Sequence, residues 1–98
     1  MTTVHTLASG SSGNAAVFTC GDTHLLIDAG ISCRRITAAL KELGLTPVEL
    51  TAILVTHTHS DHISGLNTLL KKTDCPILAT PRTCRELDCR FPGIEPRL

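Results

Sequence analysis

The heptapeptide Thr56-His57-Thr58-His59-Ser60-Asp61-His62 follows directly on the apolar run Ala52-Ile53-Leu54-Val55. An aliphatic run of this kind predicts a buried strand, and the residues after it lie at the carboxyl end of that strand, where α/β proteins place their chemistry. The heptapeptide holds three imidazoles and a carboxylate within six positions. Borderline divalent ions such as zinc accept this mixture of nitrogen and oxygen donors. We therefore predict a metal site in this stretch.

The spacing of the histidines supports a shared ion. His57 and His59 are two residues apart, so in an extended or loop backbone their side chains turn toward the same side and can converge on one ion through neutral nitrogens. Asp61 and His62 are adjacent and open the next amphipathic segment, where they can hold a second ion or orient water on the first. The alternative is a surface loop that happens to contain histidines, but three of them beside an aspartate at a strand end make that interpretation the weaker one.

The pattern His57-x-His59-x-Asp61-His62 resembles the signature of the metallo-β-lactamase superfamily. Members hold one or two metal ions at the edge of an αββα sandwich and hydrolyse their substrates with metal-activated water. The resemblance implies that His57 and His59 ligate the first metal, that Asp61 and His62 ligate the second, and that Asp61 is the catalytic candidate. Zn2+ is the expected ion, and Mn2+ is the alternative.

Two further stretches narrow the resemblance. Ser9-Gly10-Ser11-Ser12-Gly13-Asn14 and Leu25-Leu26-Ile27-Asp28-Ala29-Gly30 are similar to the YycJ/WalJ-like branch of the superfamily. That branch implies hydrolysis of phosphodiester bonds by a nuclease-like activity, with nucleic acid as the substrate. A thioester or lactam substrate is the alternative within the superfamily, because the metal motif is shared across those chemistries. A noncatalytic metal-binding or association module is the alternative from another class.

The resemblance covers roughly residues 3–85 and only the N-terminal part of the family's fold. No histidine occurs after His62. A third histidine for the first metal, a bridging aspartate and a last histidine for the second metal therefore have no matching residues. We expect residues 1–98 to form the N-terminal part of a metallo-β-lactamase-like α/β domain, a β-meander followed by β-α-β-α units. The isolated chain is then expected to be inactive or weakly active, and to self-associate or to pair with a missing C-terminal half.

Composition limits the other function classes. The chain has zero net charge, two Phe, and no Trp or Tyr, so its core must be built from aliphatic residues. A balanced charge argues against strong nonspecific binding to nucleic acid and against binding to anionic membranes. No run reaches the roughly 18 apolar residues of a membrane span, and the N-terminus lacks a signal peptide pattern, so a cytoplasmic protein is expected. The five cysteines show no C-x-x-C spacing, which favours reduced thiols.

The first part of the chain predicts an antiparallel meander. Strands are expected over 3–8, 15–20 and 24–28, with turns at 9–14 and 21–22. Composition favours a plain hairpin connection for 9–14, although its small residues could also form a phosphate cradle. Leu25-Leu26-Ile27 lacks polar alternation, which suggests a strand covered on both faces.

Asp28 ends the third predicted strand, and a carboxylate there needs hydrogen-bond donors. It either caps neighbouring backbone N–H groups or supports a ligating histidine, and the sequence leaves both roles open. Ser32 is a natural N-cap for a helix that ends at Gly44. Basic residues off its apolar stripe are expected on a solvated face, namely Arg34, Arg35 and Lys41.

The second part predicts two more strands and two more helices. A strand is expected over 52–56, and a second amphipathic helix is expected over 63–70, with Lys71-Lys72 in its last turn. A short strand over 77–79 and a helix from Pro81 through about Cys89 follow. Residues 91–98 show no periodicity.

Overall fold

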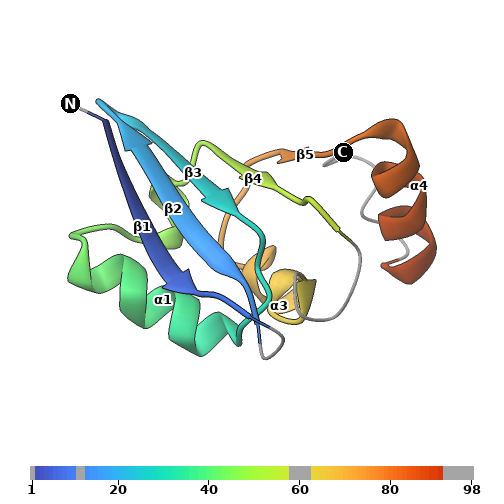
Figure 1. Ribbon diagram of the computed structural model, residues 1–98, viewed down its shortest axis with the longest axis horizontal. Helices are drawn as coiled ribbons and strands as arrows, with labels where there is room; N and C mark the ends of the chain where they lie inside the picture. Colours follow the sequence, from blue (N-terminus) through green and yellow to red (C-terminus); the bar gives the residue numbers. More distant parts are fainter. Residues whose placement is uncertain (1, 11–12, 58–62, 92–98) are drawn as a thin grey trace.

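The fold is built on one five-stranded mixed sheet (Figure 1). A computed structural model describes residues 2–10, 13–57 and 63–91. The strands lie in the order β1-β2-β3-β4-β5, in which β1 to β3 pair antiparallel and β3 to β5 pair parallel. Their bounds are β1 Thr2–Ala8, β2 Ala15–Cys20, β3 Thr23–Ile27, β4 Ala52–Leu54 and β5 Ile77–Leu78. The predicted meander and the predicted α/β class are both confirmed.

Helical segments connect the parallel strands, and one further helix follows the last strand. They are α1 Cys33–Glu42, the 3-10 turn η1 Pro47–Glu49, α3 Leu66–Leu69 and α4 Pro81–Arg90. Ser32 caps α1 as predicted, because its Oγ accepts a hydrogen bond from the Arg35 backbone N–H at 3.2 Å. Thr80 caps α4 in the same way through the Thr83 N–H. Within the described residues, no helix is both long and apolar enough to cross a membrane.

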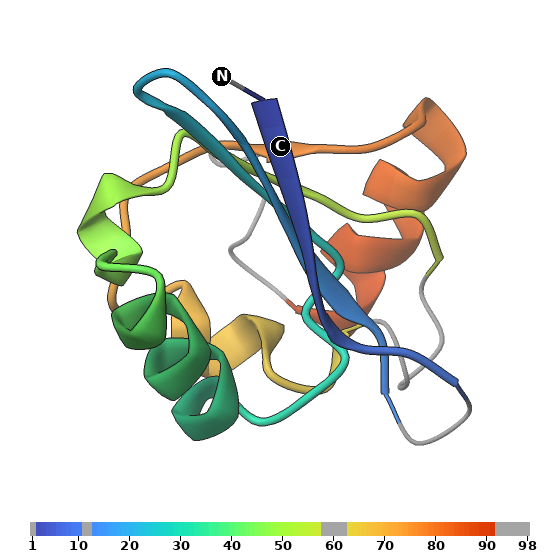
Figure 2. The ribbon, with the colours of Figure 1, turned by 60° about the vertical axis from the view of Figure 1, so that its left-hand side comes forward.

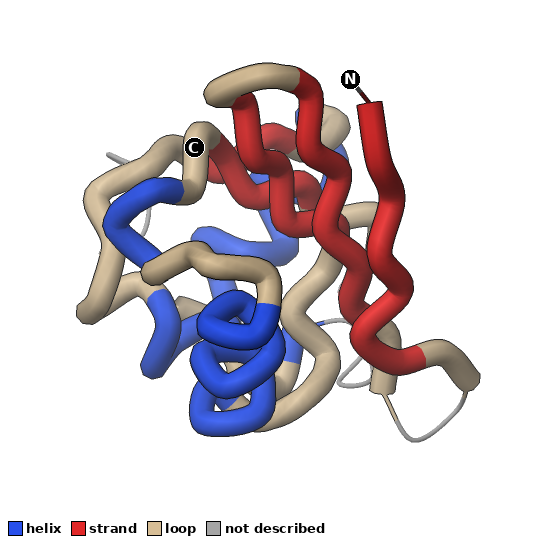
Figure 3. Tube along the Cα trace, turned by 90° about the vertical axis from the view of Figure 1, so that its left-hand side faces the viewer, coloured by secondary structure: helices blue, strands red, loops and turns tan. Residues whose placement is uncertain are grey.

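The core lies between one face of the sheet and the helices α1 and α3. Val17, Leu26, Ile53 and Ile77 face one another across β2 to β5 and are all buried. They pack in one cluster with Ile36 and Leu40 of α1 and with Leu66 and Leu69 of α3. Figures 2 and 3 show these helices together on one side of the sheet. Burial of each such aliphatic side chain contributes roughly 1.5–3 kcal/mol.

The opposite face of the sheet is also apolar, but neither α1 nor α3 covers it. Val4, Phe18 and Leu25 are in register on this face, and Leu78 lies on it at the far edge. Val4 is 61% exposed and Leu78 is 49% exposed. Leu25 and Ile27 are only half-buried. The prediction that residues 25–27 are covered on both faces therefore holds for one face in the described part of the chain.

Two element ends differ from the prediction. The helix expected over 63–70 is described only as α3, with Gly65 as its N-cap, and Lys71 and Lys72 lie beyond its end. The Gly65 N–H donates to the Ala29 carbonyl at 2.8 Å, which attaches the chain at Gly65 to the turn after β3. The strand expected to reach Thr56 ends at Leu54, because the Thr56 N–H donates to a side chain instead of a neighbouring strand.

We expect Gly65→Ala to destabilise the fold. A Cβ at Gly65 would lie 2.1 Å from the Ile31 carbonyl oxygen and 3.0 Å from the Cys33 nitrogen, and both are backbone atoms that cannot rotate away. Overpacking of this kind costs about 1–3 kcal/mol. The measurement is the free energy of unfolding in urea. Asn67→Ala, at an exposed position of α3, is the control and should change it by less than about 0.5 kcal/mol. Equal effects of the two variants would contradict the close packing at Gly65.

Candidate metal centre

Two sequence-distant segments meet at one edge of the sheet. Because β3 and β4 are parallel, their carboxyl ends lie at the same edge. Asp28 follows β3, and Thr56-His57 follow β4 after Val55. The Asp28 N–H donates to the Leu54 carbonyl at 2.7 Å, which extends the strand pairing by one bond. The register therefore carries the Asp28 side chain to Thr56.

The Asp28 carboxylate is buried and accepts two hydrogen bonds from one residue. Asp28 is 5% exposed. Its Oδ1 accepts from the Thr56 backbone N–H at 2.8 Å, and its Oδ2 accepts from the Thr56 Oγ1 hydroxyl at 2.7 Å. Asp28 also has a φ of +63°, a left-handed conformation that aspartate tolerates better than most residues. These two bonds offset the cost of burying the charge.

A third hydrogen bond extends this arrangement to the first histidine of the motif. The Thr56 Oγ1 lies 3.1 Å from the Nδ1 of His57. A threonine hydroxyl has one proton, and this proton is donated to Asp28, so Thr56 must accept from His57. Assigned from this network, Nδ1 carries the imidazole proton and Nε2 carries the lone pair. Asp28 thus accepts from a backbone N–H, which is the first of the two roles that the sequence left open, and it is connected to His57 through the Thr56 hydroxyl.

The arrangement fits a nitrogen ligand for a divalent ion. A metal-ligating histidine usually donates its other ring N–H to an oxygen, which fixes the ring and its tautomer. His57 is exposed and shows this pattern with Thr56. The other three candidate ligands, His59, Asp61 and His62, lie outside the described residues. Among the residues that are described, no group of three or more His, Cys, Asp or Glu side chains could hold a metal.

Both flanks of the motif are attached to the same turn. On the N-terminal side, Thr56 is bonded to Asp28. On the C-terminal side, the Ser64 hydroxyl donates to the Gly30 carbonyl at 2.7 Å, and the Gly65 N–H donates to the Ala29 carbonyl. The three-residue turn 28–30 therefore fixes where the motif leaves β4 and where it enters the segment before α3.

The loop between β1 and β2 is a hairpin connection in its described part. Asn14 Oδ1 accepts from the Gly10 N–H at 3.1 Å, and Asn14 Nδ2 donates to the Gly10 carbonyl at 2.9 Å. Gly13 N–H bonds within the loop to Gly10 as well. Because these backbone groups bond inside the loop, the hairpin interpretation is favoured over a phosphate cradle. The loop also contacts the turn, since the Gly30 N–H donates to the Asn14 carbonyl at 2.8 Å.

Thr56 is the functional residue that the sequence alone did not identify. It stands at the head of the motif, and only its partners reveal its role in holding Asp28 and His57 together. A threonine immediately before the first motif histidine is the available signal, but its partner Asp28 is distant in the sequence.

The five cysteines are all free thiols, as predicted.

Comparison with known proteins identifies the family of the chain. Residues 8–88 match the family model of the metallo-beta-lactamase superfamily. The chain is 43% identical over 82 residues to exodeoxyribonuclease WalJ of Streptococcus pneumoniae and 42% identical over 82 residues to exodeoxyribonuclease YycJ of Bacillus anthracis. Each alignment covers 84% of this chain, but only 30% of the pneumococcal protein and 31% of the anthrax protein.

A solved structure gives the same result for the fold. The Rm3 metallo-beta-lactamase superposes with a TM-score of 0.73 at 29% sequence identity, over 86% of this chain and 32% of that one. The likeness in fold therefore agrees with the sequence matches. The chain belongs to the metallo-β-lactamase superfamily and is a YycJ/WalJ-like member of it.

Proposed function

We propose that this chain forms the N-terminal, metal-binding part of a hydrolase that cleaves phosphodiester bonds in DNA. The observation that carries the proposal is the series of hydrogen bonds from Asp28 through Thr56 to His57, which presents His57 as a neutral nitrogen donor at the carboxyl edge of the sheet. The two exodeoxyribonuclease relatives support DNA as the substrate, since each aligns over most of this chain.

In this proposal His57 and His59 hold one divalent ion, and Asp61 and His62 hold a second. Zinc fits the donor set, and manganese is the alternative. When bound, the ions supply Lewis acidity, which activates water as the nucleophile and stabilises charge on the phosphate. Asp61 is the proposed catalytic carboxylate.

The chain's other residues position these donors. Asp28 accepts hydrogen bonds from the Thr56 backbone N–H and from the Thr56 hydroxyl, and so fixes the direction of that hydroxyl. Thr56 then accepts the Nδ1 proton of His57 and holds the ring in one tautomer. Ser64 and Gly65 hold the other flank against the turn 28–30.

The chain spans about a third of the length of the relatives it matches. The activity of a whole protein of this family is therefore part of the proposal. We propose that the remaining ligands and much of the substrate pocket come from sequence that pairs with this unit. We also propose that the protein is cytoplasmic.

A lactam or thioester substrate is less favoured, because the more similar relatives are named as nucleases whereas the lactamase likeness is at 29% identity. A noncatalytic metal-binding module is the remaining alternative.

The first test is the dependence of metal binding on the motif. We expect the chain to bind zinc, and we expect His57→Ala and His59→Ala each to lower the bound stoichiometry after dialysis at neutral pH. His24→Ala is the matched control, because His24 lies away from the motif and bonds Thr19 instead. Atomic emission analysis of the dialysed proteins measures the zinc. Unchanged zinc in both motif variants would show that the site lies elsewhere.

The second test is the Asp28→Asn variant. A carboxamide offers one acceptor oxygen where the Asp28 carboxylate offers two, so one Thr56 donor loses its partner at a cost of about 1–3 kcal/mol in unfolding free energy. If the introduced amide N–H donates to the Thr56 hydroxyl, that hydroxyl turns its proton toward His57 and places the lone pair on Nδ1. Zinc affinity should then fall about 10–100-fold.

Isothermal titration measures the affinity of the Asp28→Asn variant, and nitrogen-15 chemical shifts of the histidine rings report the tautomer. Thr56→Ser keeps the hydroxyl and is the control that should retain both the affinity and the tautomer. A tautomer that is the same in Asp28→Asn and in the unmodified chain would contradict the assigned network.

The third test asks for the activity. We would join residues 1–90 to the part of the YycJ relative that follows its aligned segment, and measure release of nucleotides from end-labelled DNA. Metal-dependent release is expected, and Asp61→Asn in the same chimera should abolish it without changing the melting temperature measured in chelator. Hydrolysis of a chromogenic cephalosporin but not of DNA would favour the lactam alternative. A folded, zinc-loaded chimera that hydrolyses neither would favour the noncatalytic module.

A further inference from the structure

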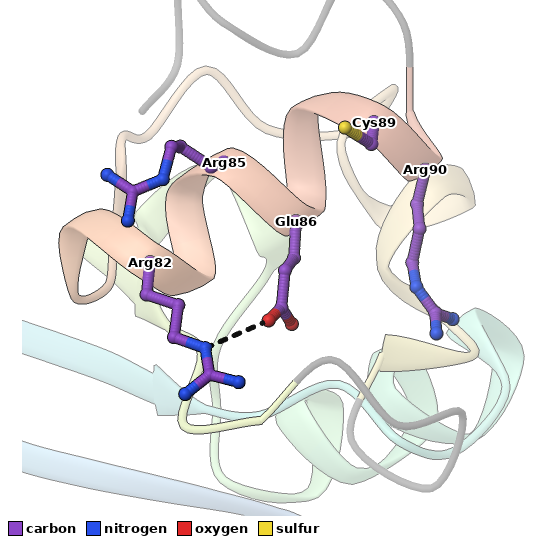
Figure 4. A pocket seen from close by; sticks show the side chains of 5 residues that line it. All are labelled: Arg82, Arg85, Glu86, Cys89 and Arg90. Carbon is purple, nitrogen blue, oxygen red and sulfur yellow. Dashed lines mark hydrogen bonds and ion pairs between the residues drawn. The ribbon is translucent and has the colours of Figure 1, made fainter.

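Helix α4 carries a local excess of positive charge on a chain with no net charge. Arg82, Arg85 and Arg90 line an open hollow of about 410 Å³ together with Glu86 and Cys89. Among the described lining residues, three guanidinium groups and one carboxylate give two net positive charges. With Asp88 counted, helix α4 has a net charge of +1, whereas the whole chain has none. Figure 4 shows Arg82, Glu86 and Arg90 extending to the same side of the helix, as their spacing of four residues requires.

This helix begins at the edge of the sheet that carries the candidate metal centre. Strands β4 and β5 are parallel, and the Val55 N–H donates to the Leu78 carbonyl at 3.0 Å. Beyond this bond, β4 continues into Thr56-His57, and β5 continues through Thr80 into α4. Arg82 therefore follows four residues after Leu78, and His57 follows two residues after Val55, on two neighbouring strands that end at the same edge. Figures 1 and 2 both show α4 beside the carboxyl ends of β4 and β5.

The ion pair between Arg82 and Glu86 leaves the positive charges of Arg85 and Arg90 in this hollow. Arg82 Nε and Glu86 Oε1 are 3.4 Å apart, with side chains 85% and 43% exposed. An exposed pair of this type contributes little to stability, so its arginine can exchange partners at small cost. A guanidinium fork matches the geometry of a phosphate and binds it with two parallel hydrogen bonds. Glu86 would oppose such binding by like-charge repulsion.

We propose that the arginine face of α4, made of Arg82, Arg85 and Arg90, binds backbone phosphates of the DNA strand whose end is held at the metal centre. This inference rests on the proposed function and adds the surface that positions the substrate. Arg82 and Arg90 are eight residues apart, about 12 Å along a helix. That span is enough to contact more than one phosphate of a strand, whose charges repeat about every 3.4 Å along a duplex axis.

The first experiment measures binding of the 98-residue chain to a fluorescein-labelled single-stranded oligonucleotide by anisotropy, across a series of salt concentrations and with chelator present. We expect salt-dependent binding. Arg82→Gln combined with Arg90→Gln should make the log K against log salt slope shallower by about 1.4, because each lost contact to a single strand removes about 0.7. Lys41→Gln removes one exposed charge near the far end of α1 and is the control, which should leave the slope unchanged.

Glu86→Gln distinguishes DNA binding by the arginines from a purely structural role of these residues. It removes the repelling carboxylate and the competitor for Arg82, so it should bind the oligonucleotide more tightly than the unmodified chain. No salt-dependent binding, or the same slope in the double arginine variant and the unmodified chain, would overturn the proposal. Weaker binding by Glu86→Gln would overturn it too.

A footprint locates the strand independently of affinity. Cys89 lines the hollow, and Cys20 is also exposed but lies at the opposite edge of the sheet, where it pairs with Thr23. The oligonucleotide should slow alkylation of Cys89, measured by peptide mass spectrometry, and should leave Cys20 unchanged. Equal rates at Cys89 with and without DNA would place the strand elsewhere and refute the proposal.

The anisotropy and alkylation experiments are both to be done in chelator, so their outcome does not depend on metal binding or hydrolysis. Failure of the arginine face would leave zinc binding and nuclease activity of the chimera intact. Failure of the proposed function would instead appear as an inactive chimera whose arginine-dependent DNA binding persists.

Discussion

The site depends on a buried carboxylate that must have hydrogen-bond donors. Asp28 lies buried just after β3, and the Thr56 backbone N–H and hydroxyl both donate to its carboxylate, which offsets the cost of burying the charge. The parallel register of β3 and β4 brings the two residues together, and the left-handed conformation of Asp28 turns the chain at the point where the strand pairing stops. The same turn, residues 28–30, then bonds Asn14, Ser64 and Gly65. Removing the carboxylate therefore affects both the stability of the turn and the orientation of His57.

Most of the fold could be predicted because its elements follow from local patterns. Aliphatic runs gave the strands, and Ser32, Gly44 and Pro81 marked helix ends through capping and backbone preferences that act within a few residues. The differences arise where a distant residue decides the outcome. The strand β4 stops before Thr56 because Asp28 takes the Thr56 N–H, and Gly65 bonds Ala29 across a close backbone contact. Neither partner is visible in a local window of sequence.

The candidate site divides along the same line. Residue types and spacing were sufficient to propose His57, His59, Asp61 and His62 as ligands, and of these the structure describes His57. The hydrogen bonds that connect Asp28, Thr56 and His57 became visible only in the three-dimensional register. The charge of the chain gives a similar lesson, since zero net charge argued against an electrostatic surface for nucleic acid. That argument averages over the molecule, whereas Arg82, Arg85 and Arg90 line one hollow on helix α4, which follows β5.

Attachment of both motif flanks to one turn also bears on how tightly a metal could be held. Thr56 and Ser64 are eight residues apart in the sequence, and each is bonded to the turn 28–30. Bringing ligands together costs conformational entropy, and a segment whose two ends are already fixed has less of it to lose. None of the bonds between the motif flanks and the turn 28–30 involves Val4 or Leu78, the exposed side chains of the open apolar face. The hydrogen bonds that hold both flanks of the motif therefore form within the described part of this chain.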